Sequence, residues 1–225
     1  MKKFLGLIFA LLLITNSALA MKFSQPVKIG EIGFPVQAPY SGFIVYGANS
    51  NTGTPYNEEH TYKGAPLQTY KKGVATFGGG KDALFCSYDF DAENNDALKF
   101  GGRNNFILNR AGTFNDILKI ETDKNLTLYV IYHNYCTSDL NIIGINNGAW
   151  QNYIDSKKIS AQYFDGNDGY KMDGSVIYEM PTCSGDKIII PYHRWYWKGE
   201  TETEGAIILK WNDAAQKFSI DKNIY

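Results

Sequence analysis

Two of the three histidines in the chain occupy matching positions, each directly after a tyrosine that ends an apolar run. They are His133 and His193, and Asp89 holds the same position after another such run. Imidazole nitrogens and a carboxylate could bind a divalent metal together, or act as acid–base groups near neutral pH. One hypothesis is therefore that these three side chains converge on a ligand site. The alternative is that each ends a strand at its solvent-exposed edge and hydrogen-bonds to local backbone.

The segment after His193 is rich in aromatic rings. Strand alternation would place His193, Trp195 and Trp197 on one face, and Arg194 with Tyr196 on the other. An exposed tryptophan beside Arg194 could stack on a sugar or dock a protein partner. Alternatively, the rings pack inside the fold. Trp197 adjoins a polar loop and is the better candidate for exposure.

Catalytic and cofactor motifs are absent from the sequence. It has no G-x-S-x-G, no H-E-x-x-H and no P-loop, and we predict no catalytic residue, no metal and no cofactor. Two acidic stretches, 89–96 and 165–173, carry the oxygen ligands that calcium takes. The first lacks a glycine and in the second the glycine comes one residue early, so asparagine- and aspartate-rich turns explain both.

The N-terminus has the features of a secretory signal peptide. Lys2 and Lys3 precede an unbroken apolar run over 4–14, and Ala18-Leu19-Ala20 matches an A-x-A cleavage site. The run is too short to span a bilayer. We expect a mature chain that begins at Met21 and is exported from a bacterium, to the periplasm or outside the cell.

An exported chain can form disulfides, and this one has three cysteines. Cys86 lies in an apolar run and is expected to be a small buried hydrophobe. Cys136 and Cys183 lie in turn-like surroundings, which favours a Cys136–Cys183 disulfide. The alternative is three unpaired thiols.

Charge excludes one class of partner. Without the signal peptide, 20 basic residues face 23 acidic ones, and nothing clusters into a basic stripe. Nucleic acid is therefore not expected as a partner. Neither a later membrane span nor a basic amphipathic helix is present, so membrane insertion is not expected either.

Short runs and turns predict an all-β chain with an internal repeat. Four apolar runs end at tyrosines with spacings of 42, 44 and 60 residues. Each run follows a turn and an earlier strand-like segment, and the last three are followed by two more. We predict a single all-β domain over 21–225, made of four-stranded antiparallel meanders. The candidate units are 27–70, 74–108, 117–154 and 176–220.

The second run of several units is apolar on both faces, as in Leu128-Tyr129-Val130-Ile131. Such a strand needs protein above and below it. The pattern resembles the blades of β-propellers in general, and predicts about four blades. Pro191, inside one of these runs, argues against that fold because it removes a ladder hydrogen bond. A β-sandwich or jelly roll is the alternative.

Repeated meanders with variable polar loops favour a binding module over an enzyme. The expected ligand is a glycan, a peptide or a component of the cell envelope. One alternative is an envelope-directed hydrolase with acid–base residues on loops. Another is a structural or assembly protein.

Overall fold

The computed structural model describes the chain with gaps, and every structural statement below refers to these parts. The described residues are 20–33, 43–46, 49–51, 55–62, 65–70, 72–78, 82–89, 98–101, 106–108, 114–133, 140–155, 158–159, 174–196 and 203–221.

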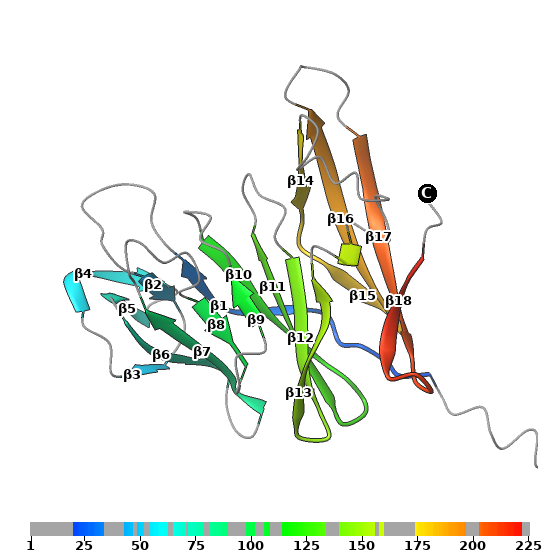
Figure 1. Ribbon diagram of the computed structural model, residues 1–225, viewed down its shortest axis with the longest axis horizontal. Helices are drawn as coiled ribbons and strands as arrows, with labels where there is room; N and C mark the ends of the chain where they lie inside the picture. The colour runs from blue at the N-terminus through cyan, green and yellow to red at the C-terminus, as the bar shows by residue number, and fades with distance from the viewer. Residues whose placement is uncertain are drawn as a thin grey trace, which may run out of the picture.

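The chain is all-β, and its strands form three antiparallel sheets (Figure 1). The largest, here called the central sheet, has eight strands. Their order is β13 (Ala149–Asp155), β12 (Leu140–Asn146), β11 (Leu126–His133), β10 (Phe114–Glu121), β1 (Val27–Gly33), β2 (Phe43–Tyr46), β5 (Ala65–Tyr70) and β4 (Pro55–Tyr62).

Each of the other two sheets has five strands. The β6–β9 sheet has the order β3 (Asn49–Asn51), β6 (Lys72–Phe77), β7 (Leu84–Asp89), β8 (Leu98–Phe100) and β9 (Phe106–Leu108). The β14–β18 sheet has the order β14 (Gly174–Tyr178), β16 (Lys187–Tyr196), β17 (Thr203–Asn212) and β18 (Lys217–Asp221), and β15 (Thr182–Ser184) also pairs with β16.

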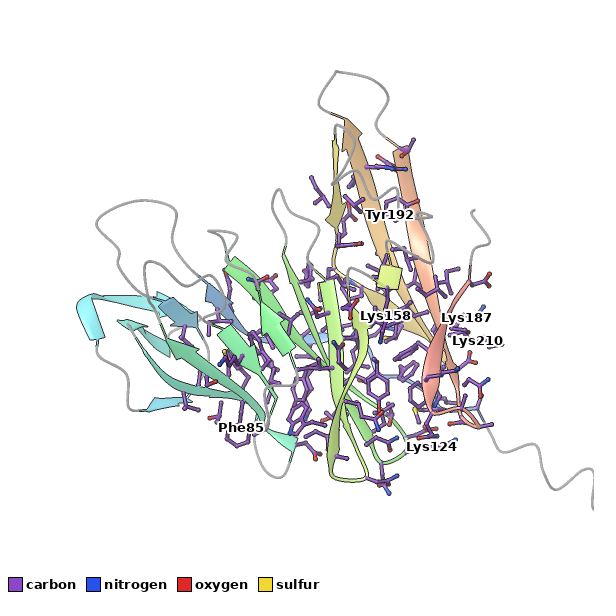
Figure 2. The ribbon with its side chains drawn as sticks, in the orientation of Figure 1. Phe85, Lys124, Lys158, Lys187, Tyr192 and Lys210 are labelled. Carbon is purple, nitrogen blue, oxygen red and sulfur yellow. The ribbon has the colours of Figure 1, made fainter. Side chains whose placement is uncertain are left out.

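The central sheet is covered on both faces. One apolar cluster, the C-terminal core, joins side chains of β10–β13 to those of β14–β18 (Figure 2). A second cluster, the N-terminal core, joins the opposite face of β1, β2 and β10–β12 to β6, β7 and β8. Strand β11 shows the alternation directly: Leu128 and Val130 lie in the first core, and Tyr129 and Ile131 in the second. All four are fully buried, as an apolar pattern on both faces requires.

The all-β class is confirmed, but the propeller is not, because the described strands pair across the boundaries of the expected blades. In a propeller each blade is a separate sheet that stacks face to face with its neighbours. Here β1 pairs edge to edge with β10, from Val27 opposite Lys119 to Gly33 opposite Phe114. Strands from the first and third expected units therefore share one sheet. The two-sided burial comes from stacked layers, which is closer to the sandwich alternative.

Pro191 is accommodated inside β16 by a change of partner strand. Thr182 of β15 pairs with Ile189, and Tyr178 of β14 pairs with Tyr192, so Pro191 faces the link between these two strands. Its carbonyl accepts a hydrogen bond from the Glu179 amide of that link at 2.9 Å. Because the backbone N and O of a strand residue point to the same side, the missing N–H removes no bond to β17.

Candidate functional site

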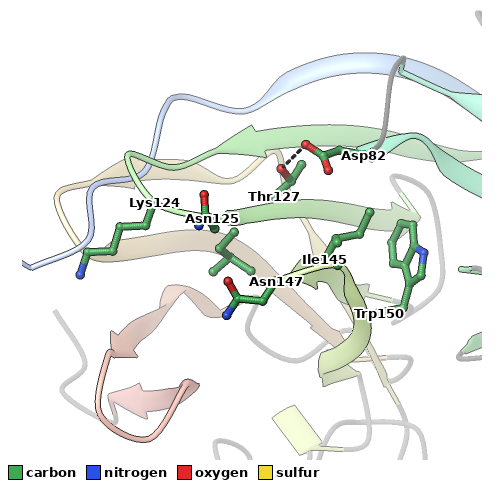
Figure 3. A pocket seen from close by; sticks show the side chains of 9 residues that line it. Asp82, Lys124, Asn125, Thr127, Ile145, Asn147 and Trp150 are labelled. Atoms are coloured by element: carbon green, nitrogen blue, oxygen red, sulfur yellow. Dashed lines mark hydrogen bonds between the residues drawn. The ribbon is translucent and has the colours of Figure 1, made fainter.

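An open pocket lies at one end of the central sheet, where the β10–β11 and β12–β13 turns meet the start of β7. Its volume is about 530 Å³. Figure 3 shows Trp150 at one end and Lys124 at the other. The lining residues are Asp82, Lys124, Asn125, Leu126, Thr127, Ile145, Asn147, Gly148 and Trp150.

Two tight turns place the polar side chains of this pocket. Asn147 and Gly148 have φ values of 50° and 80°, the left-handed pair that a two-residue hairpin prefers. In the other turn, the Thr122 hydroxyl donates to the Leu126 carbonyl at 2.7 Å. The backbone N–H of Asn147 donates to the backbone carbonyl of Asn125 at 3.3 Å and so ties the two turns together. The pocket is therefore built on strand ends that hold each other in place.

The indole of Trp150 is supported from within the fold. It is partly buried and packs on the N-terminal core, with its ring centroid 5.9 Å from that of Tyr129. The Tyr129 hydroxyl donates to the backbone carbonyl of Asp82, which fixes the start of β7 against the central sheet. Burial, together with the charges of Asp82 and Glu121, raises the pKa of Tyr129 above its usual range, so this donor keeps its proton.

The two charged side chains of the pocket differ in how strongly they are paired. The Lys124 ammonium lies 2.7 Å from the Asp213 carboxylate, outside the pocket lining. Among the described residues, the Asp82 carboxylate accepts one long hydrogen bond, at 3.4 Å from the Thr127 hydroxyl (Figure 3). Asp82 is the only carboxylate among the described residues that line the pocket. With the exposed Asn125 and Asn147 beside it, the pocket offers donors, acceptors and one aromatic ring.

Of the residues predicted from the sequence, His193 is the one whose surroundings are best defined. Its Nε2 contacts the Glu179 carboxylate, and its Nδ1 lies 3.5 Å from the Glu204 carboxylate. The two carboxylates contact different ring nitrogens, and a metal ion bound to one nitrogen of His193 would lie beside only one of them. Within the described parts of the chain, no group of three or more His, Cys, Asp and Glu residues could hold a metal ion.

The convergence of Asp89, His133 and His193 stays a prediction. They belong to β7, β11 and β16, which lie in three different sheets. The side chains of Asp89 and His133 lie outside the described residues, as does the side chain of Trp195.

The other residues of the aromatic segment add little to a site. Trp197 lies entirely outside the described residues. Arg194 is half-buried in β16, opposite Val176. Neither Arg194 nor His193 lines the pocket.

The expected Cys136–Cys183 disulfide is not formed, because Cys183 is a free thiol. Its side chain is only 7% exposed and packs in the C-terminal core, rather than reaching out of a turn. Burial raises the pKa of Cys183 to about 12, so the thiol is protonated and unreactive. Cys136 lies outside the described residues. Cys86 is a buried free thiol, as predicted.

A second polar cluster lies on the central sheet. The Lys28 ammonium lies 2.6 Å from Asp116 and 2.9 Å from Glu31, and the Tyr132 hydroxyl donates to Asp116 at 3.4 Å. Burial and the neighbouring Asp116 raise the pKa of Tyr132 to about 12. Each carboxylate already has a partner within the cluster, so we assign it a structural role.

Local sequence patterns indicate the turns of the pocket but do not join them into a site. Asp123-Lys124-Asn125 and Asn147-Gly148 are evident turn sequences. What brings Asp82 to them is the packing of the β6–β9 sheet on the central sheet, and no local pattern indicates that contact.

Comparison with known proteins adds no assignment. No family model, no curated protein and no solved structure matches the chain. In the parts of the chain that the structure describes, no helix has the length and apolar character to cross a membrane.

Proposed function

We propose that this chain is a bacterial binding module that recognises a glycan in the pocket at Trp150. The observation that carries the proposal is one supported aromatic ring that shares an open pocket with a carboxylate, two amides and a hydroxyl. Sugar rings present an apolar face of C–H groups and an edge of hydroxyls. An indole stacks on the first, and short polar side chains hydrogen-bond to the second.

The arrangement of charge favours a ligand without a strong negative charge. The Lys124 ammonium is already paired with Asp213, so little positive charge is directed into the pocket. In the described parts of the chain, the Asp82 carboxylate accepts only the long Thr127 hydrogen bond, and it can accept further hydrogen bonds from two ligand hydroxyls. A neutral or amino sugar fits these groups better than a phosphate or a uronic acid.

The pocket supports binding more than hydrolysis. Glycoside hydrolysis generally needs two carboxylic groups, one on each side of the scissile bond. Asp82 is the only one among the described lining residues. An envelope-directed hydrolase therefore remains the second candidate, and release of reducing sugar from a bound oligosaccharide would favour it.

Export to the periplasm or the exterior is part of the proposal. The charged start, apolar run and A-x-A sequence of residues 1–20 support it. A glycan-binding module outside the cytoplasm would meet envelope polysaccharides, peptidoglycan among them.

The test is a calorimetric titration of the protein with neutral oligosaccharides and with soluble peptidoglycan fragments. Trp150→Ala should weaken binding about tenfold or more, because a loss of about 1.4 kcal/mol corresponds to that factor. Gln151→Ala is the matched control: Gln151 is exposed on the same strand and points to the opposite face. Equal affinity of wild type and Trp150→Ala, or no binding to any of these sugars, would overturn the proposal.

A further inference from the structure

The residues around the expected cleavage site change abruptly in environment. Ala20 is exposed, whereas the next side chain, Met21, is 2% exposed and belongs to the C-terminal core. Phe23 lies in the same core, with its ring centroid 5.9 Å from that of Phe218 in β18. The boundary between core and solvent therefore falls at the Ala20–Met21 peptide bond.

Backbone hydrogen bonds hold the segment 22–24 against two sheets. The Lys22 amide donates to the Asp123 carboxylate at 2.9 Å, and the Ser24 amide donates to the Glu121 carbonyl at 2.8 Å, both on the central sheet. The Phe23 amide donates to the Gly185 carbonyl at 2.9 Å, in the β15–β16 turn of the other sheet. These residues act as a clasp between the two layers that enclose the C-terminal core.

The nitrogen of Met21 itself faces a carboxylate. Asp213 contacts Lys124 at 2.7 Å and accepts a hydrogen bond from the Trp211 indole at 3.0 Å. Lys124, the Trp211 indole and, more weakly, the Met21 backbone N–H lower the pKa of its carboxyl. The Asp213 side chain is 31% exposed, so a charge beside it keeps some contact with water.

We propose that the mature chain begins at Met21 and that its new α-ammonium group pairs with Asp213. A leader endopeptidase with water as co-reactant would hydrolyse the Ala20–Met21 bond, leaving a carboxylate on Ala20 and an amine on Met21. The amine takes up a proton and becomes a cation where an uncharged peptide N–H stood before. Hydrolysis precedes docking, because the Met21 side chain is buried in the folded chain. Removal of the leader thus completes the clasp with an ion pair.

The first test is the intact mass of the full chain after expression with its leader in an export-competent bacterium. The expected mass corresponds to the 205 residues that start at Met21. Retention of the leader, or a start at any other residue, would overturn the proposed processing site.

The second test compares Asp213→Asn in two forms of the protein, one starting at Met21 and one retaining residues 18–20. The Lys124 and Trp211 contacts are common to both forms, so only the α-ammonium differs. Asp213→Asn should lower the melting temperature of the processed form by about 2 °C more than that of the extended form.

Asp123→Asn is the matched control for this comparison. Asp123 accepts a hydrogen bond from the Lys22 peptide N–H, which is present in both forms. Its substitution should shift the two melting temperatures equally. If Asp213→Asn also shifts them equally, the α-ammonium makes no contact with Asp213 and the proposed ion pair is wrong.

Discussion

Lys28 and Glu31 are three residues apart in one strand, yet they lie on the same face. In a regular strand, side chains three apart point to opposite faces. Between Lys28 and Gly30 the pairing of β1 with β10 shifts by one residue, which marks a bulge. The bulge brings Lys28 and Glu31 together over Asp116, while Ile29 and Ile32 both face the N-terminal core.

Loss of the Lys28 cation should destabilise the fold. Lys28→Met leaves the carboxylates of Glu31 and Asp116 side by side, and the Asp116 side chain is only 8% exposed. We expect the free energy of unfolding in urea to fall by about 2–4 kcal/mol. Lys119→Met is the control, since its partner Glu121 is 67% exposed and an exposed ion pair contributes little to stability. Equal losses in the two variants would contradict the buried role of Lys28.

The stabilisation that Lys28 provides to Asp116 and Glu31 depends on pH. Burial alone would lower the pKa of Lys28, but hydrogen bonds and charge interactions with Asp116 and Glu31 outweigh it, and the pKa lies above its ordinary value. A raised pKa means that the stabilisation is complete below the unfolded value of about 10.4 and is lost as the pH rises above it. The difference in stability between wild type and Lys28→Met should therefore stay constant near neutral pH and shrink only in alkali.

At the scale of strands, two glycines are required by their neighbours rather than by a turn. A Cβ on Gly144 in β12 would lie 2.6 Å from the Thr127 carbonyl oxygen and 2.8 Å from a methyl carbon of Leu128. A Cβ on Gly205 in β17 would lie 2.6 Å from the hydroxyl oxygen of Tyr192, the outer end of a ring. A backbone atom cannot move aside without disturbing the sheet, whereas the far end of a side chain can shift.

This difference predicts an order of stabilities. Gly144→Ala should lower the free energy of unfolding by about 3 kcal/mol or more, and Gly205→Ala by about 1–2 kcal/mol. Tyr192→Leu should relieve most of the loss in Gly205→Ala, because it removes the atoms that clash. Chemical denaturation of the single and double variants measures this. Additive losses in the double variant would contradict the assignment of the clash to Tyr192.

The strands themselves could largely be predicted from the sequence, because their signals are local. Alternation, the Asn147-Gly148 turn and the two-sided apolar pattern of 128–131 all indicate what the structure shows. What covers the two faces could not be predicted, because blades of a ring and stacked layers bury the same residues. The pairing of Val27 with Lys119 joins residues far apart in the chain, and no local pattern specifies it. The pocket depends on the same kind of distant contact.

At the scale of the whole molecule, the central sheet belongs to both cores and should couple them. Val130 and Ile131 are adjacent and fully buried, but they face opposite cores. Ile131→Ala should cost about 2–4 kcal/mol, and hydrogen exchange should show a comparable loss of protection in β16 and β17, which Ile131 does not face. Val130→Ala should likewise reduce hydrogen-exchange protection in β6 and β7, which Val130 does not face. Loss confined to the nearer sheet would show that the two cores unfold independently.

The pairing of β1 with β10 also affects how the chain folds as it is synthesised and exported. When the chain is synthesised and exported N-terminus first, β1 is available long before β10. One edge of β1 therefore has unpaired backbone N–H and C=O groups during that time. Such an edge invites pairing with other chains, and bulges and charged side chains are the usual protection. Strand β1 has both, in the bulge beside Ile29 and in Lys28 and Glu31. The bulge and the charged side chains that stabilise the folded sheet therefore also protect β1 from pairing with other chains before β10 is available.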